Sequence, residues 1–236
     1  MESSLYAAFA LGLILGVKHA LDADHVIAVS TIVTEHRSFK WASLIGAFWG
    51  LGHTVTLFMV GLLVIGLRLT IPPKLALGLE FLVALMLIFL GGSIIWRSFL
   101  RERVHAHTHA HNPETHTHFH LHGRSEENHS HSHPFRSMRK PFLVGMVHGL
   151  AGSAALMLLV LTTIPSPLAG LAYIVIFGAG SVGGMLALSS MIAVPFVLTA
   201  QRFSLFNRWI RVVAGAASIA FGLILGWEIL SSKSLL

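Results

Sequence analysis

Long apolar segments alternate with short polar ones along the whole chain. Six of them are apolar over about 20 residues, enough to cross roughly 30 Å of hydrocarbon. These segments lie near residues 4–33, 41–66, 73–97, 142–164, 168–199 and 209–230. Prolines at the segment boundaries, as in Pro72-Pro73, are typical of turns between helices. The pattern predicts an all-α integral membrane protein with six transmembrane helices.

The first and fifth segments are longer than a bilayer requires. Each contains glycine or polar residues near its middle. We therefore expect a tilt or a local break in these two spans rather than extra height.

The composition supports a membrane protein and excludes several other classes. Hydrophobic residues make up 54% of the 236-residue chain and charged residues only 11%, about half the charged fraction of a soluble protein. The absence of cysteine excludes disulfide scaffolds, zinc ribbons and thiol chemistry. The net charge of +6 would suit nucleic acid, but the basic residues flank apolar segments. We expect a lipid bilayer as partner and no nucleic acid.

Basic residues predict the orientation in the cytoplasmic membrane. The loops after the first, third and fifth spans hold twelve Lys and Arg residues, whereas the opposite side holds three. Because basic residues accumulate in cytoplasmic loops, we expect both termini outside and the long third loop inside the cell.

Two glycine–histidine segments divide the chain into similar halves. Residues 16–19, Gly-Val-Lys-His, match residues 145–148, Gly-Met-Val-His, at an offset of 129. Residues 50–53 match residues 178–181 at an offset of 128. Three spans per half require the second half to be inverted, which is a recurrent transporter plan with the site near the midplane. The alternative is a chance likeness between glycine-rich membrane helices.

This repeat gives three regions. Residues 1–100 form the first three-helix half, and residues 141–236 form the second. Between them, residues 101–140 are predicted to be a disordered cytoplasmic loop that holds eleven of the 16 histidines. Its alternating histidines are typical of a segment that chelates divalent metals with little discrimination. The alternative is a segment that only stores metal ions and that transport does not require.

The strongest chemical signal lies near the middle of the first span, in residues 19–25. Each charge at a helix centre costs roughly 2.5–3.5 kcal/mol, so such a cluster should face protein, a partner or a cation. On a straight helix His19, Asp22 and His25 share an arc of about 120°. Asp24 then lies outside this arc and would hold an imidazole in place, unless the helix unwinds and brings it in. The alternative is an ion-pair network that only joins helices.

Imidazole and carboxylate together, with no thiolate, suit Ni²⁺, Co²⁺, Zn²⁺ or Cu²⁺ and argue against Cu⁺. Mg²⁺ prefers oxygen ligands alone. His53 and His148, each beside a glycine within a span, are the other candidate ligands. The alternative for each is a core histidine bonded to a backbone carbonyl.

The histidine motifs resemble those of a known family. His19, Asp24 and His25 form a His-x4-Asp-His pattern within HALDADH that resembles the signature of the nickel/cobalt transporter (NiCoT) family. Residues 48–54, FWGLGHT, resemble its second histidine motif, and residues 148–153, HGLAGS, are similar to the short UreH-like members with six spans. The chain lacks the eight spans and the acidic second-half motif of the larger permeases.

The resemblance implies transport of Ni²⁺ or Co²⁺, with His19, Asp24 and His25 as the primary residues and no prosthetic group. It also implies cytoplasmic nickel chaperones or urease maturation proteins as partners. We predict a secondary permease for uptake. The alternatives are an efflux protein loaded by the histidine-rich loop, or a membrane metalloenzyme that holds a metal-bound water. We interpret Glu80 and Glu228, near the outer ends of their spans, as interfacial carboxylates rather than residues that attract cations.

Overall fold

The computed structural model describes residues 2–33, 38–67, 69, 71–100, 105–111, 114–120, 138–151, 164, 166–199 and 204–231. Its helices include α1 (Glu2–His19), α2 (Ala23–Val33), α3 (Phe39–Leu67), α4 (Pro73–Leu100), α6 (Pro167–Thr199) and α7 (Ser204–Ser231). Residues 138–151 are also helical.

The apolar helices confirm an α-helical protein with several membrane passes. Helices α3, α4, α6 and α7 are each long and apolar enough to cross a bilayer, and α1 and α2 together make one bent span. The described residues therefore provide up to five spans rather than the predicted six. The difference is the predicted fourth span, 142–164, because its residues 152–163 lie outside the described part of the chain.

The predicted break in the first span is confirmed. Helix α1 ends at His19, α2 begins at Ala23, and the two are bent by 55°. Across the break the amides of Leu21 and Asp22 donate to carbonyls three residues back, at 2.9 and 3.1 Å, which is the tight turn of a 3₁₀ helix. In contrast, α6 runs without interruption from Pro167 to Thr199, so the fifth span has no break there.

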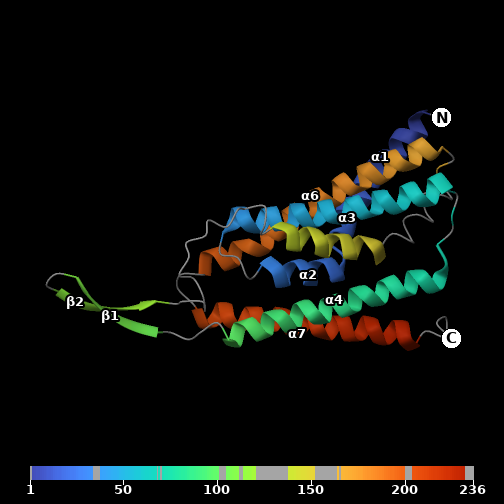
Figure 1. Ribbon diagram of the computed structural model, residues 1–236. Coiled ribbons are helices and arrows are strands. Elements are labelled where there is room, and N and C mark those ends of the chain that lie inside the picture. The colour runs from blue at the N-terminus through green and yellow to red at the C-terminus, as the bar shows by residue number, and fades with distance from the viewer. Residues whose placement is uncertain are drawn as a thin grey trace.

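Glycines allow the helices to pack closely in pairs (Figure 1). Gly46 lies against Met185 and Gly50 against Val182, so α3 and α6 run antiparallel. Helix α1 packs parallel to α6, and residues 138–151 pack parallel to α3. Helices α4 and α7 form a separate antiparallel pair, and α2 contacts both of them. The short helix α2 and residues 138–151 lie between these two layers (Figure 1).

The loop predicted to be disordered contains a hairpin of strands β1 (His105–His111) and β2 (Glu114–His120). The strands are antiparallel, with His105 opposite His120 and His107 opposite His118. An alternation with period two suits a β-ladder, and the predicted disorder of residues 101–140 as a whole stays a prediction. Residues 121–137 lie outside the described part. The hairpin projects from the end of the bundle opposite to both termini (Figure 1).

Candidate metal centre

The break in the first span turns the polar residues of the HALDADH segment toward one another. His19 is the last residue of α1, whereas Asp24 and His25 lie in the first turn of α2. His25 is fully buried, and the side chain of His19 is 23% exposed. Because the helix does not continue through residues 20–22, the spacing on a straight helix does not apply, and Asp24 faces the same space as His25.

Two histidines from other helices complete the cluster. His53 in α3 places its Nε2 atom 3.2 Å from Nε2 of His19. His148 places its Nε2 atom 2.8 Å from Oδ2 of Asp24. Both side chains are buried. Five of the six predicted residues therefore meet in one place.

Glycines explain how His53 and His148 come so close. A Cβ atom at Gly149 would lie only 2.6 Å from the backbone carbonyl oxygen of His53. A Cβ atom at Gly52 would collide with the carbonyl of Phe142. Only glycine permits the two helices to approach at this distance, so the glycine beside each histidine serves the packing.

The donor atoms form two overlapping groups. One is His19, His25 and His53, and the other is Asp24, His25 and His148; within each group, one ligand atom per residue lies within 4.8 Å of the others. His25 belongs to both. Its ring centre is 4.6 Å from that of His19 and 4.0 Å from that of His148. This spacing allows an ion to be held by three or more side chains.

Asp24 orients two of the imidazoles. Its Oδ1 atom accepts from the backbone amide of His25 at 2.9 Å and from Nδ1 of the same residue at 3.0 Å. Its Oδ2 atom accepts from Nε2 of His148. These bonds assign a proton to Nδ1 of His25 and to Nε2 of His148, so that the other nitrogen of each ring is a free acceptor.

Asp22 orients the imidazole of His19 in the same way, but from a more exposed position. Its Oδ2 atom accepts from Nδ1 of His19 at 2.8 Å, and its side chain is 50% exposed. Nε2 of His19 then accepts from Nε2 of His53. Asp22 belongs to neither donor group in the described part of the chain. The break thus gives Asp24 the central position that a straight helix would have given to Asp22.

Among the described residues, three imidazole nitrogens of the cluster are buried without a hydrogen-bond partner: Nε2 of His25, Nδ1 of His53 and Nδ1 of His148. In the proton arrangement above, each carries a lone pair. A buried polar atom without a partner costs about 1–3 kcal/mol. Histidines that ligate metals commonly donate their other N–H to a carboxylate, as His25 and His148 do here. The cluster therefore fits a cation better than it fits a closed network of hydrogen bonds.

The distances also fit one transition-metal ion. Imidazole nitrogens bind such ions at about 2.0–2.1 Å, so two ligands of one ion lie roughly 3–3.4 Å apart. The Nε2 atoms of His19 and His53 lie 3.2 Å apart, within this range, and both would bind one ion if the proton of His53 were on Nδ1 instead of Nε2.

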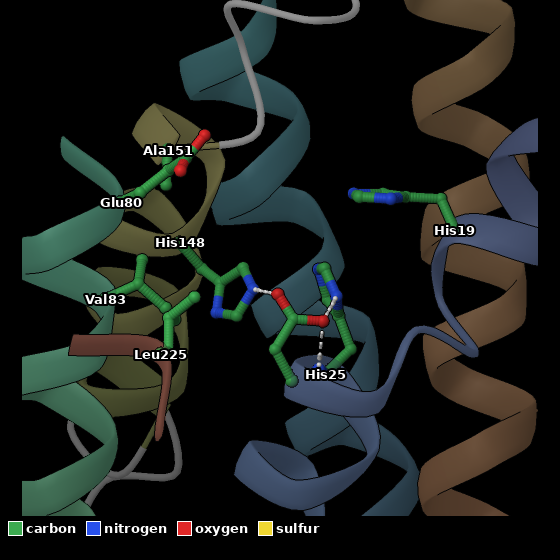
Figure 2. A pocket seen from close by; sticks show the side chains of 8 residues that line it. His19, His25, Glu80, Val83, His148, Ala151 and Leu225 are labelled. Carbon is green, nitrogen blue, oxygen red and sulfur yellow. Dashed lines mark hydrogen bonds and ion pairs between the residues drawn. The ribbon is translucent and has the colours of Figure 1, made fainter. Parts of the chain in front are cut away.

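A cavity of about 190 Å³ opens beside the cluster (Figure 2). Its polar lining comes from His19, Asp24, His25, His148 and Glu80, the last from α4. Val83, Ala151 and Leu225 supply the apolar wall. The sequence had suggested that Glu80 was interfacial. A carboxylate within an apolar span was the one sign in the sequence that Glu80 could have a function. Its position on the cavity follows only from the packing of α4 and α7.

The comparisons with known proteins agree with this chemistry. The model of the family NicO, high-affinity nickel-transport protein, matches residues 5–226. The urease accessory protein UreH of Bacillus sp. (strain TB-90) is 38% identical over 222 residues, which cover 94% of this chain and 91% of that protein. No solved structure matches the chain.

Proposed function

Since the chain belongs to the NicO family of high-affinity nickel-transport proteins, we propose that it is a secondary permease that carries Ni²⁺ or Co²⁺ into the cell. Membership makes it a nickel transporter and not an enzyme, which removes the metalloenzyme alternative. The proposal concerns the residues that hold the ion, the direction of transport and the mechanism.

The observation that carries the proposal is the pair of donor groups that share His25. We propose that His19, His25, His53 and His148 bind the ion through nitrogen. Asp24 and Asp22 orient these rings, and the charge of Asp24 offsets part of the charge of the ion. Nitrogen and carboxylate donors without thiolate favour Ni²⁺ and Co²⁺ over Cu⁺.

We further propose that the two halves are inverted repeats that exchange conformations to give alternating access. Reciprocal contacts support this. Gly16 packs on the carbonyl of Phe177, and its counterpart Gly145 packs on the carbonyl of Trp49. The same reciprocity holds between α3 and α6, where Gly50 packs on Val182 and Gly178 packs on Thr54. It also holds between α4 and α7, where Gly91 packs on Gly215 and Gly222 packs on Ala84.

The proposed orientation has both termini outside and the histidine-rich hairpin in the cytoplasm. The distribution of Lys and Arg supports it, as do the opposite positions of hairpin and termini (Figure 1). The chain has no cysteine, so a single Ser231→Cys can report the side of the C-terminus. Labelling by an impermeant maleimide added to intact cells is expected, and labelling only after lysis would reverse the orientation.

In the cytoplasm the hairpin would collect ions that have crossed. The register supports this role, because it pairs His105, His107 and His109 with His120, His118 and His116 across the ladder. We propose that ions pass from there to nickel chaperones or urease maturation proteins, as the name of the relative UreH suggests. The same hairpin would instead load an efflux protein if transport ran outward.

Uptake of radiolabelled Ni²⁺ by cells without their own nickel transporter tests the function. Expression of the parent is expected to raise cellular nickel and sensitivity to added nickel, and His25→Ala is expected to abolish both effects. Lower cellular nickel and greater tolerance would favour efflux. An unchanged rate in His25→Ala, at equal amounts of protein in the membrane, would refute the proposed site.

A further inference from the structure

Glu80 is an acidic side chain of the cavity that the proposed ion site does not use. It lies in α4, is half-buried, and lines the cavity together with His19, Asp24, His25 and His148. Figure 2 shows Glu80 beside Ala151, on the opposite side of the view from His19. Its carboxylate makes no hydrogen bond or ion pair with the part of the chain that the structure describes.

A half-buried carboxylate without a partner would be stabilised by a nearby cation. The residues around Glu80 on the cavity wall are Val83, Ala151 and Leu225, which offer no hydrogen bond from a side chain. No Lys or Arg lines the cavity within the described residues. Removing a carboxylate from water without a partner costs several kcal/mol. The two carboxylates on the lining, of Asp24 and Glu80, together carry the charge of −2 that would neutralise one divalent ion.

Glu80 also lies on the side of the cluster from which an ion would arrive. Helix α4 begins at Pro73, at the end of the bundle that carries both termini (Figure 1). Seven residues of helix place Glu80 about 10 Å inside that end. In the proposed orientation this end faces the outside of the cell. An ion that moved through the cavity toward the histidines would pass this carboxylate.

We propose that Glu80 is the entrance residue for the divalent cation: it attracts and holds the ion in the cavity before the ion passes to the histidines. This inference rests on the proposed transport function and adds a second position on its pathway. A charged group at the mouth of a low-dielectric cavity raises association rates roughly 10- to 1000-fold. Glu80 therefore acts on capture of the ion rather than on the final affinity of the histidine cluster.

The chain offers a matched control. Glu228 lies in α7, near the same end of the bundle, but its side chain is exposed and does not line the cavity. In cells, Glu80→Gln is expected to raise the KM for Ni²⁺ uptake about tenfold with little change in the maximal rate. Glu228→Gln is expected to keep the parent KM. Glu80→Asp, which keeps the charge, should restore most of the loss, and it serves as the test variant if Glu80→Gln does not reach the membrane.

Salt dependence separates an electrostatic role from a structural one. Raising external salt from about 0.01 M to about 0.15 M shortens the Debye length from ~30 Å to ~8 Å. At constant osmolarity, this change should raise the KM of the parent and of Glu228→Gln. It should have a smaller effect on Glu80→Gln, which lacks the charge.

Nickel binding to the purified full chain provides a readout that does not need transport. The ring of Trp49 lies 5.8 Å from that of His148, so Ni²⁺ in the cluster should quench tryptophan fluorescence. Glu80→Gln should slow association about tenfold and keep the parent number of ions bound, whereas His25→Ala should lower that number.

Three results would overturn the entrance role: equal association rates in Glu80→Gln and Glu228→Gln, equal KM values in these two variants, or loss of the bound ion in Glu80→Gln. The last would make Glu80 a ligand of the cluster. Failure of the transport proposal is distinguishable, because it would appear as absence of uptake by the parent or as normal binding in His25→Ala.

Discussion

The carboxylates of Asp22 and Asp24 belong to one short segment but lie in very different surroundings. Asp24 accepts from the rings of His25 and His148, whereas Asp22 accepts only from His19 and is half-exposed. We therefore expect Asp24→Asn to weaken nickel binding and uptake far more than Asp22→Asn. The substitution keeps the size of the side chain and removes its charge.

The expected loss of nickel affinity in Asp24→Asn can be worked out from the hydrogen bonds that Asp24 accepts. A bond to a charged group contributes about 1.5–3 kcal/mol, and a neutral one about 0.5–1.5 kcal/mol, so each bond loses roughly 1–1.5 kcal/mol. The two bonds that Asp24 accepts from imidazole rings give a loss of about 2–3 kcal/mol, which is roughly 30- to 150-fold in nickel affinity. This agrees with the 10- to 100-fold effect of removing a group that orients a ligand. Asp22 accepts one exposed hydrogen bond, so we expect Asp22→Asn to lower the nickel affinity tenfold or less.

The assay is equilibrium binding of ⁶³Ni²⁺ to the purified chain in detergent, together with initial uptake rates in cells. Both variants must be present in the membrane at the parent level and melt within a few degrees of the parent. Parental affinity in Asp24→Asn would refute the assignment of Asp24 to the site. A greater loss in Asp22→Asn than in Asp24→Asn would show that the straight-helix arrangement, and not the broken one, holds the ion.

Three further predictions concern packing, linkage and the hairpin. Gly145→Ala places a Cβ against the carbonyl of Trp49 and should destabilise the protein by about 1–3 kcal/mol, measured as a lower Tm, whereas Gly183→Ala meets nothing within 4 Å and should not. Nickel at about 100 times its Kd should stabilise the parent by roughly 2.7 kcal/mol; the melting temperature of His25→Ala should not respond. Replacing the histidines of residues 105–120 by serine should lower the number of Ni²⁺ ions bound per chain without raising the uptake KM, and a raised KM would make the hairpin part of the pathway.

The membrane helices were predictable because hydrophobicity over 20 or more residues is a strong and local signal. The predicted spans 41–66, 73–97, 168–199 and 209–230 lie within or close to α3, α4, α6 and α7. The break in the first span was predictable too, because charged residues in mid-membrane are incompatible with a plain apolar helix. The hairpin was not predicted, because a polar segment rich in histidine suits a disordered chain as well as a β-ladder.

The residues of the candidate site were predictable from the sequence as a possible cluster, but their arrangement was not. His19 and His25 carry a signal in their spacing alone, whereas the orientation of Asp24 depends on where the helix breaks. The meeting of His53 with His148 depends on contacts between helices that are distant in sequence. The position of Glu80 on the cavity depends on such contacts too, since the cavity also involves α7 and residues 138–151.

The donor set is split across the joint between α1 and α2. His19 belongs to one helix, and Asp24 and His25 belong to the other, with a bend of 55° between them. Any rotation of α2 about residues 20–22 would separate His19 from His25 and pull the carboxylate of Asp24 away from His148. An ion held as proposed would link the two helices across this joint, so a change in the bend would change the distances between its ligands.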